Sequence, residues 1–104
     1  MMQGIYLKLF VPEGLRHHGD LLYDLILKQA ESIGIPGGTA VQAVAGFGRH
    51  GHIHEQHFFE LAGELPIIIE FFAADEAIDQ LLALLAGEKH SLFYIKFHAE
   101  AGQT

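Results

Sequence analysis

The sequence predicts an α+β fold in which two helices cover one face of a four-stranded antiparallel sheet. Side chains alternate in character with a period of two in segments near both ends of the chain, which is typical of strands. Two other segments carry apolar residues at helical spacing, and clusters of Gly and Pro separate the segments. The resulting order is strand, helix, strand, strand, helix, strand. Because strand–helix–strand connections are right-handed, both helices are expected on the same face of the sheet.

The first half of the chain contains a strand, a helix and a second strand. Residues 3–11 alternate in character, and Pro12 opens a turn that ends this strand. From Asp20 the apolar residues follow helical spacing, so Asp20 is predicted to cap a helix that Gly34 ends. Residues 39–45 predict the second strand. Its two valines do not share one face, which indicates a bulge.

The second half of the chain predicts the remaining three elements. Residues 66–72 are almost continuously apolar, which favours a central strand buried on both faces. A helix is predicted over residues 75–87, and its last residue is a Gly that provides a stop. Residues 92–98 alternate again, whereas residues 99–104 are expected to fray. The elements define a ferredoxin-like βαββαβ sandwich, and we expect residues 1–104 to form one domain.

The two helices leave the other face of the sheet uncovered, and this face is predicted to be apolar. In one register the first and last strands expose Tyr6, Phe10, Leu92 and Tyr94, and in the other they expose Ile5, Leu7, Phe93 and Ile95. Both sets are large and apolar, and soluble monomers rarely expose a patch of this size. We therefore expect the chain to form an oligomer through the open face of the sheet.

The composition excludes several classes of protein. The 104 residues include no Cys, so there are no disulfides and a zinc site would need His and carboxylate ligands. Six Lys and Arg against 13 Asp and Glu give a net charge of -7, which argues against nucleic-acid binding. No apolar run approaches the roughly 20 residues that cross a bilayer, and no signal peptide is visible. We expect a cytoplasmic protein that does not insert into a membrane.

The sequence offers no set of residues that predicts an enzyme. His17 and His18 precede the first helix without a nucleophile, because Cys is absent and neither Ser32 nor Ser91 lies in a nucleophile turn. These two histidines are instead expected to bridge neighbouring subunits. The acidic pair that begins at Asp75 falls in the first turn of a helix, where carboxylates complement the helix dipole.

Several ordered segments carry a resemblance to a known family. Gly34–Thr39 and Gly46–Arg49, followed by Gly51-His52, resemble the segment that leads into the T-loop of PII signalling proteins. The chain more closely resembles a PII-like family known as domain of unknown function 190, over nearly its whole length. The segments that carry this closer likeness are Arg16–Tyr23, Gly34–Gly48, Ile53-His54 and Leu65-Pro66.

The resemblance implies a homotrimer whose open sheet faces turn inward, with small-molecule sites in the clefts between subunits. In PII proteins these sites bind adenine nucleotides, and a long mobile loop reports their occupancy to a regulated partner protein. The corresponding effector-binding residues here would be Gly46, Phe47, Gly48 and Arg49. PII proteins also hold phosphate with a Gly-rich loop after the second helix. Here residues 86–91 contain one Gly, so Arg16 and Lys89 are the remaining cationic candidates.

The effector-binding candidates also have purely structural explanations. Gly46 and Gly48 could bend the chain out of the sheet with Phe47 packed below, or expose backbone to a ligand at close range. The planar fork of Arg49 suits a phosphate or carboxylate group. The same side chain could instead remain a solvated cation or pair with Glu55.

Four histidines crowd into one short segment: His50, His52, His54 and His57. In an extended chain alternate side chains lie on one side, about 6.5–7 Å apart, and can converge on one metal ion. With His57 or Glu55 they could complete a site for zinc, copper or nickel. The alternatives are a solvated His-rich loop and a pH sensor. Two functional hypotheses follow: a PII-like regulator that binds a small anionic effector, and a trimer that binds a divalent metal.

Overall fold

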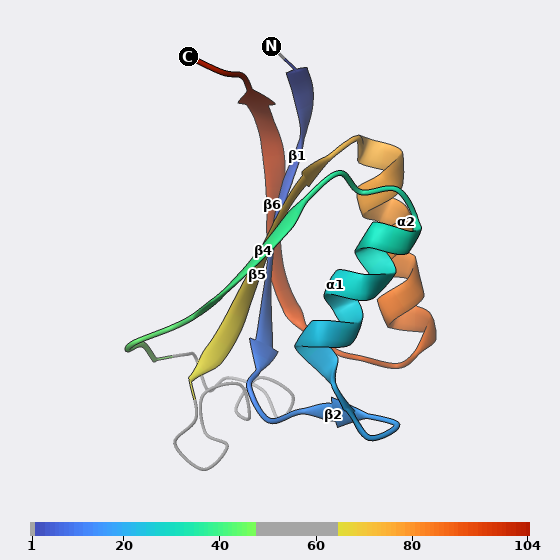
Figure 1. Ribbon diagram of the computed structural model, residues 1–104, viewed down its shortest axis with the longest axis vertical. Helices are drawn as coiled ribbons and strands as arrows, with labels where there is room; N and C mark the ends of the chain where they lie inside the picture. Colours follow the sequence, from blue (N-terminus) through green and yellow to red (C-terminus); the bar gives the residue numbers. More distant parts are fainter. Residues whose placement is uncertain (1, 48–64) are drawn as a thin grey trace.

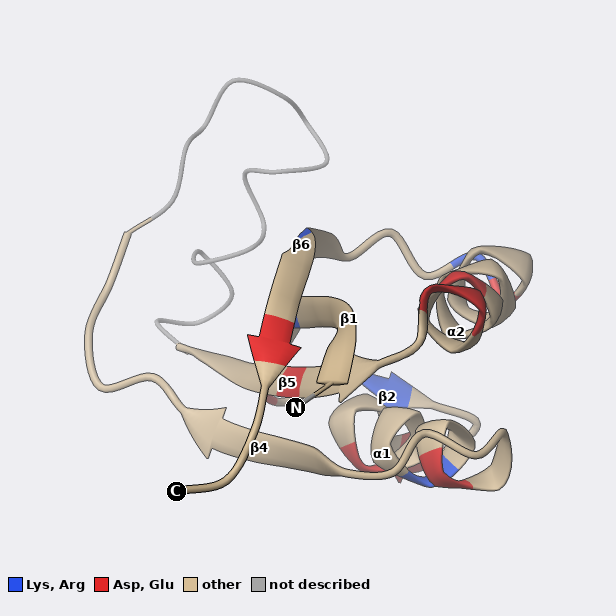
Figure 2. Cartoon of the chain, turned by 90° about the horizontal axis from the view of Figure 1, so that it is seen from above, with Lys and Arg blue, Asp and Glu red and all other residues tan. Residues whose placement is uncertain are grey.

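The computed structural model describes residues 2–47 and 65–104 and has the predicted architecture (Figure 1). The main sheet is antiparallel, in the spatial order β4-β5-β1-β6, and a separate two-stranded sheet precedes the first helix. The strands are β1 (Met2–Pro12), β2 (Arg16–His17), β3 (Asp20–Leu21), β4 (Gly38–Gln42), β5 (Pro66–Ala73) and β6 (Phe93–Ala101). Helices α1 (Leu22–Ser32) and α2 (Asp75–Gly87) lie on the same face of the main sheet (Figure 2). This is the ferredoxin-like topology that the sequence predicts.

The core lies between the helices and the covered face of the sheet. Alternate residues of β1 and β5 point into it, because successive strand residues point to opposite faces. The helices contribute residues three or four positions apart, which share one helical face: Leu22, Ile26 and Ala30 from α1, and Ile78, Leu81 and Leu85 from α2. No buried polar or charged residue occurs within the described ranges. Neither of the two described helices is long and apolar enough to cross a membrane.

A small hairpin precedes α1 where the sequence predicts only a turn. Its turn residues, His18 and Gly19, have φ angles of 52° and 89°, as in a type I′ turn. Asp20 pairs with His17 in this hairpin and does not cap the helix. Instead, α1 begins after Leu21 with no side-chain cap. The prediction that Asp20 caps the helix is therefore wrong, because the hairpin uses that residue.

Three strands also differ from expectation. β4 ends at Gln42 rather than at residue 45. β5 lies inside the sheet as predicted, but its residues alternate between buried and half-buried, so a single chain covers only one of its faces. β6 continues to Ala101, because its last residues pair with the start of β1 up to Met2. The expected fraying is therefore wrong for residues 99–101.

Both helices end in a Schellman motif, in which a left-handed residue reverses the chain. After α1 this residue is Gly34, with a φ of 92°, as predicted. After α2 it is Lys89, with a φ of 65°, rather than Gly87, which is still helical. The backbone amide of His90 donates to the carbonyl of Leu85 at 3.0 Å and closes the motif. A lysine in this conformation costs about 1 kcal/mol more than a glycine.

Lys89→Gly is therefore expected to raise the free energy of unfolding by about 0.5–1 kcal/mol, because Gly adopts the left-handed conformation without a Cβ clash. Urea unfolding measures this change. Lys28→Gly on the exposed face of α1 is the control, and it should lower the same free energy by about 1 kcal/mol. Equal destabilisation by both variants would contradict the prediction.

The sheet face opposite the helices, which we call the open sheet face, is mostly apolar. Its apolar residues are Tyr6, Phe10, Val41, Ile68, Phe72, Phe93, Ile95 and Phe97. Tyr6 stacks on Phe97 with ring centroids 4.9 Å apart, and Phe10 lies 5.4 Å from Phe93. The β6 residues of this face are about half exposed. The face thus combines β1 residues from one predicted register with β6 residues from the other.

One row of polar residues crosses the open sheet face. Thr39 of β4 pairs with Glu70 of β5, and Glu70 pairs with Lys8 of β1. The next position in this row, on β6, is Ile95. The polar row is therefore bordered by apolar residues along both neighbouring rows.

Candidate functional site

A hollow of about 580 Å³ lies at one edge of the open sheet face, beside the turn from α1 into β4. Its lining combines this turn with strand residues: Met2, Tyr6, Pro36, Gly37, Gly38, Thr39, Glu70, Phe71 and Phe72. The volume falls in the range of small-molecule pockets, about 300–1,000 Å³. The aromatic walls suit a planar apolar group. The single charged residue of the lining, Glu70, disfavours an anionic group at this position.

Gly38 brings β4 close to β5 at this hollow. A Cβ atom at this position would stand 2.5 Å from Cε1 of Phe71 and 3.2 Å from Cδ2 of Leu27. A Cβ atom at Gly37, the preceding residue, would meet nothing within 4 Å. The Phe71 ring is buried, so it has little room to yield to a larger residue. The shape of the hollow therefore depends on a glycine at position 38.

Tyr6 and Glu70 form a hydrogen bond on the wall of the hollow, with the phenol donating to the carboxylate. Burial, this hydrogen bond and the negative charge of Glu70 raise the pKa of Tyr6 to about 12. The folded chain thus favours the neutral phenol.

Titration with base is expected to show one tyrosine that ionises late, near pH 12. Because the folded-state pKa lies above the ordinary value of 10.0, the stability from this pair is complete below pH 10. It is lost as the pH rises through about 12. Tyrosinate absorbance measures the step, which Tyr6→Phe should remove and Tyr94→Phe should leave in place. A late step that survives Tyr6→Phe would assign the raised pKa to another residue.

Most of the effector-binding residues predicted from the sequence lie at or beyond the end of the described segment. Gly46 and Phe47 follow β4, and the Phe47 side chain is 92% exposed, so it does not pack beneath the sheet. Gly48 and Arg49 lie outside the described residues. The four clustered histidines, His50, His52, His54 and His57, also lie outside them. The predicted roles of these six residues remain predictions.

The other two predicted residues, Arg16 and Lys89, belong to segments that meet. Nη1 of Arg16 donates a hydrogen bond to the carbonyl of Gly19 at 2.6 Å, across the β2–β3 hairpin. The neighbouring His17 contacts His90, the residue after Lys89, with ring centroids 4.6 Å apart. The hairpin and the segment after α2 therefore lie side by side.

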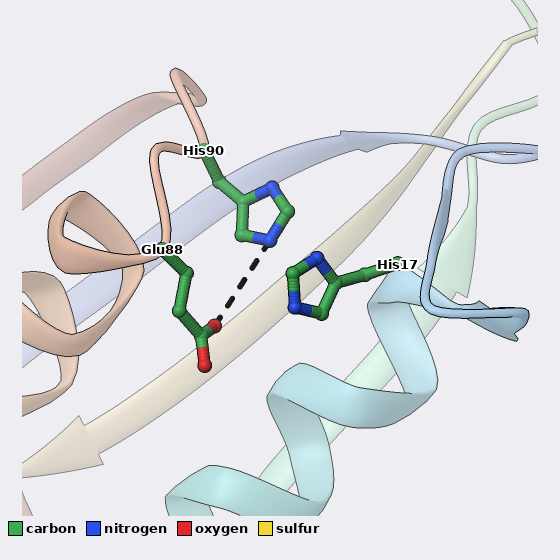
Figure 3. Close-up of side chains that lie close together, drawn as sticks. All are labelled: His17, Glu88 and His90. Carbon is green, nitrogen blue, oxygen red and sulfur yellow. Dashed lines mark ion pairs between the residues drawn. The ribbon is translucent and has the colours of Figure 1, made fainter.

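His17, Glu88 and His90 form a cluster at this junction (Figure 3). Each offers one ligand atom, and these three atoms lie within 4.8 Å of one another. The Glu88 carboxylate also accepts hydrogen bonds from Nε2 of Gln29, at 3.1 and 3.3 Å. Gln29 thus fixes the orientation of the carboxylate from the neighbouring helix α1.

His90 is the most buried member of this cluster, with a side chain that is 12% exposed. Its Nε2 atom is buried and lies 4.0 Å from Glu88, which is too far for a hydrogen bond. Among the residues that the structure describes, this atom has no hydrogen-bond partner. Burial lowers the pKa of His90, nearby His17 lowers it further, and Glu88 offsets part of the shift.

Arg16 and Lys89 are predicted from the sequence for their charge, but no sequence pattern predicts this cluster. His17 is far from Glu88 and His90 in the sequence, so no local spacing links them. The available signal was a Glu and a His two residues apart at the end of a helix, which is weak. Within the chain His17 contacts His18 and His90, and the predicted bridge to a neighbouring subunit remains a prediction.

Solved structures with the same architecture define the class of the chain. The apo form of CPII from Thiomonas intermedia K12, a nitrogen regulatory PII-like protein, gives a TM-score of 0.68 at 15% identity. The match covers 99% of this chain and 96% of CPII. CPII bound to ADP, AMP and bicarbonate gives a TM-score of 0.65 at 18% identity, over 99% of this chain and 97% of CPII. The chain therefore has a PII-like fold.

Sequence comparison places the chain more narrowly. The model of the DUF190 family, described as "Uncharacterized ACR, COG1993", matches residues 4–92. UPF0166 protein MJ1524 of Methanocaldococcus jannaschii is 34% identical over 85 residues, which cover 82% of this chain and 78% of that protein. A UPF0166 protein of Aquifex aeolicus is 28% identical over 90 residues, 86% of each chain. The chain belongs to the DUF190 family, in agreement with the resemblance seen in its sequence.

Proposed function

We propose that the chain is a homotrimeric, PII-like regulatory protein of the cytoplasm. It binds a small anionic effector, an adenine nucleotide, in the clefts between subunits. The segment that joins β4 to β5 then reports occupancy to a partner protein. The observation that carries this proposal is the apolar open sheet face, which favours assembly and adjoins the hollow.

The exposed aromatic and aliphatic residues of the open sheet face support assembly. Phe93 is 56% exposed, Ile95 43% and Phe97 53%. Burial of a side chain of this size contributes about 1.5–3 kcal/mol relative to full exposure, and each subunit would bury several half-exposed ones. Most soluble homo-oligomers have closed symmetry, and a cyclic assembly through this face would cover it. The PII-like class favours three subunits, with these faces turned inward.

A nucleotide needs an apolar surface for its base and positive charge for its phosphates, and one chain separates these two features. The hollow lies beside the start of β4. The hairpin that carries Arg16 and the end of α2, which precedes Lys89, lie toward the opposite end of the sheet (Figure 1). Gly46 and Phe47 follow the end of β4 that lies away from the hollow. These positions support a site that combines the hollow of one subunit with the cationic end of the next.

Two further observations support the effector and the partner. CPII, which shares the fold, has been solved bound to ADP and AMP. Val44 and Phe47, at the start of the segment between β4 and β5, are 94% and 92% exposed and offer apolar side chains to a partner. The divalent-metal alternative based on His50, His52, His54 and His57 remains a hypothesis, since these residues lie outside the described ranges.

Calorimetry with AMP, ADP, ATP and inorganic phosphate tests the effector, and sedimentation equilibrium tests the assembly. We expect saturable binding of an adenine nucleotide by a species of about three times the chain mass of 11.5 kDa. Arg49→Ala and Lys89→Ala should each weaken binding about tenfold, or about 1.4 kcal/mol, through the loss of a charge-assisted contact. Lys28→Ala is the matched control, because Lys28 lies exposed on α1 beside Asp24 and should not affect affinity.

Two results would contradict the proposal in different ways. A folded trimer that binds none of the nucleotides would contradict the proposed effector. A mass of one chain at working concentration would mean that no clefts between subunits exist, and it would contradict the proposed regulatory role.

A further inference from the structure

We propose that His17, Glu88 and His90 form a binding site for a divalent transition-metal ion such as zinc. The site lies within one chain, at the junction of the β2–β3 hairpin and the segment after α2 (Figure 3). It is distinct from the four clustered histidines, which lie outside the described residues. Its three residues come from the same subunit, so the site needs no assembly, although Arg16 and Lys89, the candidates for phosphate binding, are their neighbours in the sequence.

The geometry of the cluster is close to that of a metal site. Ligand atoms at 2.0–2.1 Å from a tetrahedral zinc ion stand about 3.3–3.5 Å apart. The three ligand atoms here lie within 4.8 Å of one another, and Nε2 of His90 is 4.0 Å from the Glu88 carboxylate. Figure 3 shows both imidazole rings and the carboxylate directed toward a common space. Side-chain movements of about 1 Å would bring the three atoms to coordination distance.

The backbone holds the three side chains in place before any ion binds. The Schellman motif after α2 fixes the segment from Glu88 to His90, with the left-handed Lys89 between the two ligands. The hydrogen bond from Arg16 across the hairpin turn steadies the segment that carries His17. Gln29 orients the Glu88 carboxylate, as outer-shell partners do in metal sites. The site is therefore largely preformed.

The donor set indicates which class of ion fits. Two imidazole nitrogens and one carboxylate oxygen are the ligands of many zinc sites that keep a fourth position for water or a further ligand. Calcium and magnesium prefer oxygen ligands throughout, so two imidazoles disfavour them. The negative charge of Glu88 disfavours an anion in the same space. The buried Nε2 of His90, which has no hydrogen-bond partner among the described residues, offers a free lone pair in its neutral tautomer, as metal coordination requires.

The test uses the full chain with His50, His52, His54 and His57 all replaced by Gln, so that these histidines do not compete for metal. The protein is stripped with EDTA, and zinc binding is measured by competition with a chromogenic chelator. We expect about one zinc ion per chain. In this background His17→Gln, Glu88→Gln and His90→Gln should each weaken zinc binding about tenfold or more.

Two controls separate the site from general surface histidines. The His18 ring contacts His17 at 4.1 Å but His18 does not belong to the cluster, so His18→Asn should retain full zinc affinity. Asn is chosen because it tolerates the left-handed φ of 52° at this position. His98→Gln, on the exposed strand β6, should also retain it.

A second readout does not depend on the chelator. Zinc should raise the thermal midpoint of the background protein but not that of its His90→Gln variant, because only the folded site binds the ion. Circular dichroism checks that each variant folds. If a histidine variant does not fold, Glu88→Gln replaces it in the test, because the Glu88 side chain is 34% exposed and is not part of the core. A background protein that binds no zinc, or His17 and His90 variants that bind it undiminished, would overturn the proposal.

Discussion

Ile95→Glu is expected to reduce the assembled protein to single chains of 11.5 kDa, as measured by sedimentation equilibrium. Ile95 lies on the open sheet face and pairs with Lys8 of the neighbouring strand β1. Within one chain the new carboxylate would find an opposite charge across the strands, so the fold should be retained. In the assembly the new carboxylate would be removed from water in every subunit, at an effective cost of several kcal/mol. That cost exceeds what burial of one half-exposed Ile contributes.

Leu84→Glu provides the matched control. Leu84 lies on α2 and is 37% exposed, close to the 43% of Ile95, so both substitutions place a carboxylate at a partly exposed apolar position. The control should keep the mass of the assembly. If Ile95→Glu also kept it, the open sheet face would not be the assembly surface. If both variants dissociated, the effect would not be specific to that face.

Gly38→Ala should lower the free energy of unfolding by about 1–3 kcal/mol, the usual cost of overpacking a core. The added methyl group would stand 2.5 Å from the buried Phe71 ring, so strand or ring must shift. Because Gly38 also lines the hollow, we expect nucleotide affinity to fall in the same variant. Chemical denaturation measures the first effect and calorimetry the second.

Gly37→Ala isolates the cause of this effect. A Cβ atom at Gly37 meets nothing within 4 Å, so the variant should stay within about 0.5 kcal/mol of the parent or be slightly more stable. Phe71→Leu in combination with Gly38→Ala should cost less than the sum of the two single changes, because the smaller side chain leaves space for the methyl group. If the losses in unfolding free energy of the two single variants simply added in the double variant, the Phe71 ring would not be the cause of the lost stability.

The fold was predictable because its elements depend on local patterns. The alternation in β1 and the helical spacing in α1 and α2 are legible over a few residues, and they gave the correct order of elements. Local sequence signals were less reliable where pairing between distant residues competes with them. Asp20 is a good helix cap in isolation, but the hairpin places it opposite His17. Residues 99–101 look like a polar tail, yet backbone pairing with β1 extends β6 through them.

The apolar pattern of β5 correctly predicted a strand inside the sheet, but not which of its faces a single chain buries. Continuous apolarity predicts burial on both faces, whereas a single chain buries only the face toward the helices. The other face, which includes Ile68 and Phe72, belongs to the open sheet face. The excess apolarity of this strand therefore belongs to the open sheet face, which a pattern within one chain cannot distinguish from its core.

The candidate metal site was beyond sequence reasoning for a physical reason. His17 and His90 meet only because a type I′ turn and a left-handed Lys89 redirect two distant segments toward each other. Neither conformation has a strong local signal, since Gly87 rather than Lys89 is the expected helix stop. Arg16 and Lys89 were selected for charge alone, and the structure shows that the segments bearing them adjoin.

The polar row of Thr39, Glu70 and Lys8 has a consequence for mixing between related proteins in one cell. A purely apolar surface can bind any chain of similar shape, because apolar contacts are non-directional. Polar groups that become covered must find complementary groups, and each one left unpaired costs about 1–3 kcal/mol. A paralogous chain with a different row would incur that penalty. In an assembly through the open sheet face, the row therefore favours copies of the same chain over related chains.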